Sequence, residues 1–108
     1  LNDRYFGPVV MFGLGGVFTE LLRDVSYGFA PLDLETAHEM IRATRTHPLL
    51  TGYRGRAALA VDALAETLVR VSLLAADHAD RIAEIDINPL FVSELGVVAA
   101  DALLVLRD

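Results

Sequence analysis

The strongest chemical signal lies near the end of the sequence, in the run EIDINPL at residues 84–90. Alternate side chains of an extended strand point to opposite faces, so Glu84, Asp86 and Asn88 should share one face. Pro89 has no backbone N–H to donate, which favours an edge position or a distortion of the strand directly after Asn88. The three polar side chains are therefore either exposed to solvent or ligands.

A hairpin is expected to bring a further oxygen to this face. A turn centred between Glu94 and Leu95 places Asn88 directly opposite Asp101, with Cβ atoms about 4.5–5.5 Å apart. Asp101 is the only polar residue of the run VVAADALLVL, and a carboxylate buried there needs a partner. Mg²⁺ takes one or two protein oxygens and completes its shell with waters and phosphates, so this pair is half of a magnesium site. The alternative is an Asp–Asn hydrogen bond that holds the hairpin together.

Two glycine-containing segments are weaker candidates. Gly15 and Gly16 end a GLGG run that either presents backbone N–H groups to an anion or forms a tight structural turn. The run is not a Walker loop, because the Gly-Lys-Ser/Thr ending is absent. Arg54 and Arg56 flank a glycine and either bind phosphate or carboxylate or lie at the surface.

The elements that must position these residues follow from periodicity. Apolar runs bounded by glycine and proline predict three short strands, Gly7–Phe12, Val17–Leu22 and Ser26–Ala30. Asp33 is the predicted N-cap of a helix to about Thr44, and a loop is predicted at His47–Arg56. The apolar face of that helix is expected to comprise Leu34, Ala37, Met40 and Ile41.

The strongest predicted helix follows Ala60, a poor cap. Its core stripe comprises Val61, Leu64, Leu68, Val71 and Ala75. Two strands, Ala83–Val92 and Val97–Leu106, then form the final hairpin. The order β-β-β-α-α-β-β predicts an α+β domain with two helices packed on a mainly antiparallel sheet.

Composition narrows the functional class. The 108 residues suit one domain, and their net charge of −6 gives no basic footprint for nucleic acid. No run is long enough to span a membrane, and the lack of cysteine is compatible with a cytoplasmic, reducing compartment. The apolar content of 54% is high for this length, so we expect an exposed apolar face and self-association. Leu1 is not an initiator Met, which fits a fragment of a larger chain.

Three ordered blocks of the sequence resemble one family. FGPVVMFGLGGVFTELLRDVSYGFAPL (6–32), HPLLTGYRGR (47–56) and EIDINPL with its following Asp-bearing strand are similar to the second half of an ATP-grasp domain. The resemblance is to NDP-forming acyl-CoA synthetases and the related beta subunit of succinyl-CoA synthetase. It covers almost the whole chain, and implies that residues 1–108 are a C-terminal ATP-grasp subdomain. The family interconverts acyl-CoA, NDP and phosphate with carboxylic acid, CoA and NTP, through acyl phosphate and phosphohistidine intermediates.

The resemblance implies cofactors and a partner. The cofactors are Mg²⁺ and ATP/ADP or GTP/GDP, and Asn88 and Asp101 occupy the metal-ligand positions. Asp86 matches an acidic position that faces the phosphoryl-transfer region, unless it is only a solvated strand residue. The partner is the phosphohistidine segment of the CoA-binding portion, in the same protein or a partner subunit. The nucleotide-binding positions would include Gly15, Gly16, Glu20 and Arg54, although Glu20 fits an outward strand residue equally well.

One departure from the family pattern leaves an alternative open. The family often has a basic residue two positions after the metal-binding Asp, where this chain has Leu103, opposite Asp86. The resemblance places the phosphohistidine motif elsewhere in the full protein, and none of His38, His47 and His78 matches it, so these three are expected to be structural or exposed. The alternative function is a synthetase-like regulatory or scaffolding region of a protein lysine acetyltransferase, without nucleotide turnover. In either case the 108-residue chain alone is expected to have no synthetase activity.

Overall fold

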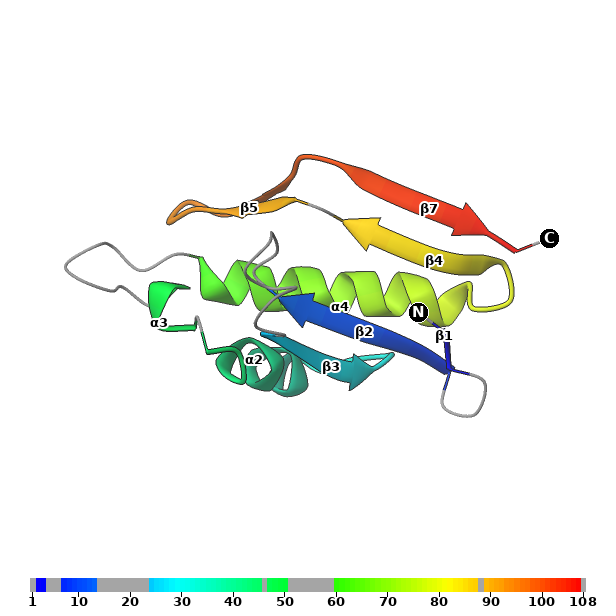
Figure 1. The fold of residues 1–108 in the computed structure, drawn as a ribbon, viewed down its shortest axis with the longest axis horizontal. Helices are drawn as coiled ribbons and strands as arrows, with labels where there is room; N and C mark the ends of the chain where they lie inside the picture. The colour runs from blue at the N-terminus through cyan, green and yellow to red at the C-terminus, as the bar shows by residue number, and fades with distance from the viewer. Residues whose placement is uncertain are drawn as a thin grey trace.

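The computed structural model describes residues 2–3, 7–13, 24–45, 47–50, 60–87 and 89–107. Its elements in chain order (Figure 1) are β1 (Asn2–Asp3), β2 (Gly7–Gly13), β3 (Val25–Phe29), α2 (Leu34–Arg42), α3 (His47–Leu50), α4 (Val61–Asp77), β4 (Ile82–Ile87), β5 (Leu90–Val92), β6 (Val97–Ala99) and β7 (Ala102–Leu106). The described strands pair antiparallel throughout, in a sheet ordered β1-β2-β3 and in two ribbons, β4-β7 and β5-β6. The predicted α+β class is confirmed, but the strands form several small sheets.

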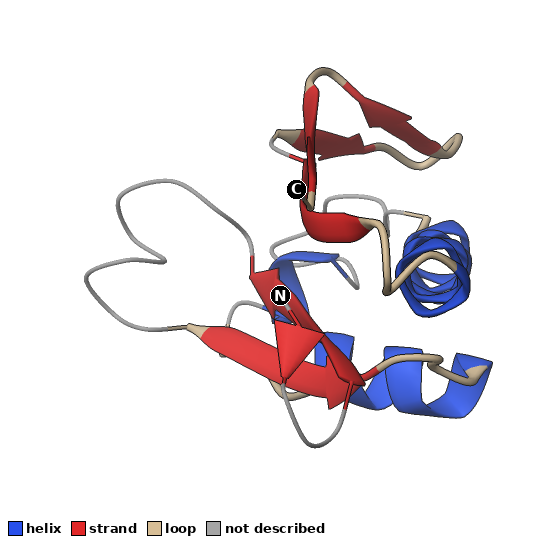
Figure 2. Ribbon diagram, turned by 90° about the vertical axis from the view of Figure 1, so that its right-hand side faces the viewer, coloured by secondary structure: helices blue, strands red, loops and turns tan. Residues whose placement is uncertain are grey.

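The helices lie on one side of the β2–β3 sheet. Figure 2 shows α4 end-on at the right, with α2 below it, the β2–β3 sheet to its lower left and the β4–β7 ribbon to its upper left. Helix α4 runs lengthwise between β2 and β4 in Figure 1, and it packs against α2. The long helix therefore holds the final hairpin relative to the first sheet.

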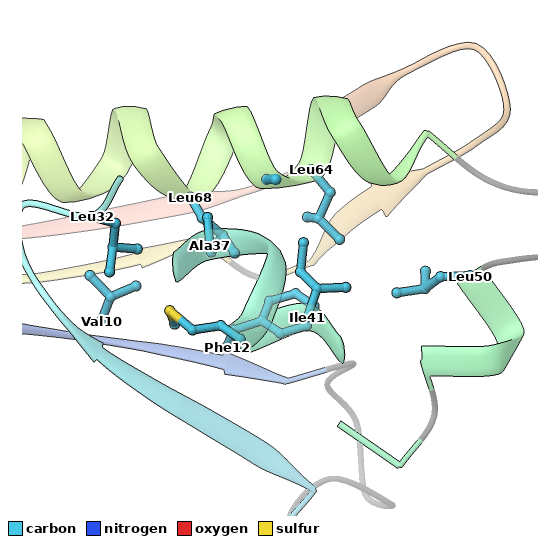
Figure 3. Packing of buried hydrophobic residues seen from close by; sticks show 10 residues of the cluster. Val10, Phe12, Leu32, Ala37, Ile41, Leu50, Leu64 and Leu68 are labelled. Atoms are coloured by element: carbon cyan, nitrogen blue, oxygen red, sulfur yellow. The ribbon is translucent and has the colours of Figure 1, made fainter. Parts of the chain in front are cut away.

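The core forms where β2, α2 and α4 meet (Figure 3). Alternate residues of β2 point into it, as expected for a strand with one solvated face. The buried apolar residues are Val10, Phe12, Leu32, Ala37, Met40, Ile41, Leu50, Leu64, Ala65 and Leu68. Three of the four residues expected on the buried face of α2 are buried, but Leu34 is exposed because the apolar stripe begins one turn later, at Ala37.

Helix α2 begins where the sequence predicts, and α4, whose start the sequence leaves open, begins directly after Ala60. The Asp33 side chain caps α2 by accepting from the N–H of Thr36 at 2.7 Å. The helix ends at Arg42, slightly before the predicted Thr44, whose Oγ1 donates to the carbonyl of Ile41 at 2.8 Å. Ala60 provides no side-chain cap for α4, as expected.

Part of the predicted loop is helical. His47–Leu50 forms the single turn α3, because proline is tolerated in the first turn of a helix, where its missing N–H is not needed. Residues 51–56 of that loop and the predicted strand Val17–Leu22 lie outside the described residues. Among the residues that are described, no helix is long and apolar enough to cross a membrane.

Each strand of the predicted final hairpin is two strands. The break on one side falls between β4 and β5, and on the other between β6 and β7. Pro89 cannot donate to a ladder, although its carbonyl accepts from the N–H of Ala100 at 3.0 Å. The turn lies at Ser93–Gly96 as predicted, closed by the Ser93 N–H donating to the Gly96 carbonyl at 2.9 Å.

Candidate functional site

The register of the final hairpin is the predicted one on both sides of its break. In the β4–β7 ladder, Asp86 pairs with Leu103. In the β5–β6 ladder, Leu90 pairs with Ala99. A single register therefore runs through both ribbons, with one irregularity at the far end of β4, between Ile82 and Glu84.

One face of the β4–β7 ribbon combines acidic and apolar side chains. Glu84 lies opposite Val105 and Asp86 opposite Leu103, and directly opposed residues share a face. Both carboxylates are exposed, whereas Ile85 on the other face is half-buried. The predicted separation of polar and apolar faces is therefore confirmed in the described part of this strand, and Asp86 is accessible from solvent.

Asp101 lies in the break between β6 and β7. Its side chain is exposed, and its Oδ1 accepts from the backbone N–H of Ala102 at 2.9 Å. The expectation that this carboxylate is buried within an apolar strand is wrong, because every residue of β7 is itself exposed. Its predicted partner, Asn88, lies outside the described residues, so their pairing stays a prediction.

The donor chemistry of Asp101 fits a hard cation. A carboxylate has two oxygens, and the hydrogen bond to Ala102 uses Oδ1 on one side only. Exposed oxygen donors suit Mg²⁺, which keeps several waters and needs few protein ligands. Among the described residues, no group of three or more His, Cys, Asp or Glu side chains is placed to hold a metal. A site at Asp101 would therefore depend on Asn88 and on oxygens supplied by the nucleotide.

The remaining predicted contacts are not in the described part of the chain. Gly15, Gly16, Glu20 and Arg54 all lie outside it, so their roles stay predictions.

The histidines have structural or exposed positions, as expected. The Nε2 of His38 lies 3.3 Å from Oδ1 of Asp62, which joins α2 to the first turn of α4. His47 is the half-buried first residue of α3, and His78 is the exposed residue that follows α4. None of these three histidines takes part in the β4–β7 ladder that carries Asp86.

A buried carboxylate outside the final hairpin was not predicted. Asp24 is 7% exposed and its Oδ1 accepts from the backbone N–H of Arg45 at 2.6 Å, directly after α2. At the opposite end of α2, the exposed Asp33 accepts from Thr36, and these hydrogen bonds hold the pKa of Asp33 below its ordinary value. In the sequence, only the position of Asp24 between the predicted strands Val17–Leu22 and Ser26–Ala30 distinguishes it from other acids.

A shallow hollow lies between β2, α4 and β4. Its lining is almost entirely apolar and comprises Pro8, Val9, Val10, Val71, Ala75, Ile82, Ala83, Glu84 and Ile85. Neither Asp86 nor Asp101 lines it, so this hollow is separate from the candidate site.

Comparison with known proteins agrees with this arrangement. A family model of the ATP-grasp domain matches residues 1–106. The beta subunit of ADP-forming acetate–CoA ligase I from Pyrococcus furiosus is 47% identical over 106 residues, covering 98% of this chain and 45% of that protein. ADP-forming acetate–CoA ligase I from Archaeoglobus fulgidus is 44% identical over 107 residues, covering 99% of this chain and 16% of that protein.

A solved structure has the same fold. The dinucleotide-forming acetyl-coenzyme A synthetase 1 of Ca. Korarchaeum cryptofilum, in complex with coenzyme A and Mg-AMPPCP, matches with a TM-score of 0.92 at 43% identity. The match covers 99% of this chain and 50% of that one, so the chain spans half or less of the relatives it matches. The agreement of sequence, topology and family model shows that this chain belongs to the ATP-grasp domain of the NDP-forming acyl-CoA synthetase family.

Proposed function

We propose that this chain is the nucleotide- and magnesium-binding portion of an NDP-forming acyl-CoA synthetase. The full protein would interconvert acyl-CoA, NDP and phosphate with carboxylic acid, CoA and NTP. The observation that carries the proposal is the register of the final hairpin, which leaves Asp101 exposed at the break between the two ladders and Asp86 exposed on the adjoining ribbon. The proposed class of reaction is supported by the related proteins, which are ADP-forming acetate–CoA ligases.

Asn88 and Asp101 are the proposed magnesium ligands. If the register of the two ribbons continues through the break, Asn88 would lie opposite Asp101, and an amide and a carboxylate oxygen suit a hard cation. Magnesium bound there would neutralise charge on the nucleotide phosphates. The break in both strands supports this proposal, because it frees Asp101 from the ladder and leaves its side chain in solvent.

The other proposed contacts follow the family resemblance. Gly15 and Gly16 would donate backbone N–H groups to phosphate, Arg54 would bind an anionic oxygen, and Glu20 would lie beside the nucleotide. Asp86 would face the incoming phosphoryl group and its carrier. In the Korarchaeum enzyme, a phosphohistidine segment points towards the nucleotide-binding site, and we propose an equivalent partner segment for this protein.

Titration of Mg-ATP into the full-length protein tests the metal site. Removing either oxygen by Asn88→Ala or Asp101→Ala should weaken binding at least about tenfold, since lost support at metal sites commonly costs 10–100-fold. Glu94→Ala is the matched control, because Glu94 is an exposed acid in the turn of the same hairpin. Equal binding by the wild-type protein and both alanine variants would remove the metal role.

A second experiment separates turnover from binding. Asp86→Asn should lower kcat for acyl-CoA formation and leave Mg-ATP affinity within about twofold, if Asp86 acts only during phosphoryl transfer. Full-length protein that binds Mg-ATP but forms no acyl-CoA would instead favour the regulatory alternative, which the apolar Leu103 opposite Asp86 also suits.

A further inference from the structure

We infer that Pro89 is a positioning residue for Asp101: because Pro89 has no backbone N–H, the final hairpin opens where Asp101 lies. The inference rests on the proposed function, in which Asp101 is a magnesium ligand. The two ribbons of the hairpin share one register but do not form one ladder, and the hydrogen bonds at the break between them give the reason.

The break coincides with one missing hydrogen-bond donor. The N–H of Ala100 donates to the carbonyl of Pro89 at 3.0 Å, so these two residues lie opposite each other within the break. Opposed residues that are hydrogen-bonded in an antiparallel ladder normally exchange two N–H···O bonds. Pro89 has no N–H, so the return bond to the carbonyl of Ala100, which would close the ladder beside Asp101, cannot form.

The hairpin turns over at this break. In β4, Ile85 and Ile87 are half-buried, whereas in β5 it is Leu90 and Val92 that pack against the core. Ile87 and Leu90 are three residues apart in the sequence, and residues with that spacing point to opposite faces of a regular strand. A regular, continuous strand would therefore turn one of these apolar pairs to solvent. The break allows both pairs to face the protein.

Asp101 lies at the turning point of the other strand. By the alternation of β6 it would share the face of Val97, which packs against the core. By the alternation of β7 it would share the face of Leu103, which lies opposite the exposed Asp86. The structure places the Asp101 carboxylate in solvent, with Oδ1 accepting from the N–H of Ala102 at 2.9 Å. An N–H at position 89 would draw the strand that carries Asp101 back into the ladder and change this orientation.

The orientation of Asp101 would determine metal affinity. Mg²⁺ demands nearly ideal octahedral geometry, so a displaced carboxylate is a poorer ligand. Residues that orient a metal ligand without touching the metal commonly contribute 10–100-fold to affinity. Pro89 would act in this way through the backbone. Its side chain is exposed, so its replacement removes no buried contact.

Pro8 provides the matched control. Its carbonyl also accepts a cross-strand N–H, from Ala30 at 2.9 Å, but β2 continues unbroken over Gly7–Gly13. In the full-length protein we would compare Pro89→Ala, Pro8→Ala, Asp101→Ala and the double variant Pro89→Ala with Asp101→Ala. The measurements are Kd for ADP by titration, once with Mg²⁺ and once with EDTA, and Tm.

We expect Pro89→Ala to raise Kd for Mg-ADP about tenfold and to leave Kd for metal-free ADP unchanged. Asp101→Ala should already remove the contribution of Pro89, so adding Pro89→Ala to it should change Kd by less than about twofold. Pro8→Ala should lower Tm, because Pro8 is buried, and leave Mg-ADP affinity at the wild-type value. If Pro89→Ala does not fold, Pro89→Ser restores the same N–H and replaces it in every comparison.

Mg-ADP affinity within about twofold of wild type in Pro89→Ala would overturn the inference. So would an equal loss of affinity with and without the Asp101 carboxylate, or an equal loss in Pro8→Ala, because Pro89 would then act on the fold and not through Asp101. Failure of the proposed function looks different. Wild-type protein would bind no Mg-ADP, or Asp101→Ala would bind it as wild type does, and the inference would fall with the metal site.

Discussion

Asp86 and Leu103 lie directly opposite each other in the β4–β7 ladder, so this acidic side chain faces a leucine across the ribbon. Asp86 is exposed, and the leucine beside it is 57% exposed. The pair therefore contributes little to stability, and it leaves the carboxylate without a cation opposite it in the ladder. Changing this pair is the first test of the ribbon's register.

Leu103→Arg should stabilise the ribbon, because it places a cation opposite Asp86. The expected gain in unfolding free energy is at most about 1 kcal/mol and should shrink at high salt, since the pair is exposed. Urea denaturation measures it. In the double variant Leu103→Arg with Asp86→Asn the gain should vanish, and a gain that persists there would contradict the pairing.

Ser72→Ala should destabilise the link between α4 and the segment that precedes α2. The buried Ser72 hydroxyl accepts from the N–H of Leu32 at 2.9 Å and donates to the carbonyl of Val69 at 2.6 Å. Its removal leaves the N–H of Leu32 unpaired in the core, which costs about 1–3 kcal/mol. Thermal or urea unfolding gives the value.

Thr67→Ala is the matched control for that change. Thr67 also lies in α4, but its hydroxyl donates to the carbonyl of Ala63 at 2.9 Å. That hydrogen bond stays within one helix and does not join two elements. Thr67→Ala should therefore lower the free energy of unfolding clearly less than Ser72→Ala does. Equal losses of unfolding free energy in the two variants would show that the hydrogen bond between Leu32 and Ser72 adds no stability of its own.

Gly28→Ala should overpack the contact between β3 and α2. An added Cβ would lie 2.7 Å from Sδ of Met40 and 2.8 Å from Cδ2 of Leu32, both well inside normal contact. Since Met40 and Leu32 are buried, we expect a loss of about 1–3 kcal/mol in unfolding free energy. The double variant Gly28→Ala with Met40→Ala should lose less than the sum of the single changes, and strict additivity would argue against the clash.

Acid should weaken the N-cap of α2. Hydrogen bonds from Thr36 lower the pKa of Asp33 in the folded chain, so folding favours the carboxylate. The stabilisation is therefore present above the unfolded pKa, near about 4, and is lost as the pH falls through the lower folded pKa. Asn is a comparable N-cap that does not titrate, so Asp33→Asn should match wild type at neutral pH. The stability of the variant should then fall less than that of wild type below about pH 4, and parallel profiles would contradict this account.

The 108-residue chain by itself should self-associate. Phe91 and Val98 lie directly opposite each other on the β5–β6 ribbon, both are exposed, and Leu95 at its turn is 94% exposed. Apolar surface of this kind promotes association. Sedimentation over a wide concentration range should show oligomers that Phe91→Lys with Val98→Lys reduces, whereas Glu66→Lys on the exposed face of α4 does not. A strictly monomeric wild-type chain would contradict the prediction.

Local sequence patterns were enough to predict the hairpin register, the beginning of α2 and the existence of the long helix α4. The alternation in residues 84–87 and a short turn at Ser93–Gly96 determine which residues oppose each other, because a slip by one would reverse both faces. The N-cap residue Asp33 predicts α2, and the apolar spacing of residues 61–77 predicts α4. Both signals depend only on residues that are close in sequence. The three longer motifs that resemble the NDP-forming acyl-CoA synthetases suggested the class of reaction, which local patterns could not.

Tertiary structure decided what depends on residues far apart in the chain. Asp24 is buried where it contacts Arg45, and no periodic pattern in the sequence near either residue predicts that contact. The exposure of β7 follows from which elements pack beside it, although its sequence is as apolar as a core strand. Burial depends on the neighbours that the fold brings together, so the apolar run around Asp101 suggested a buried carboxylate where the structure has an exposed one.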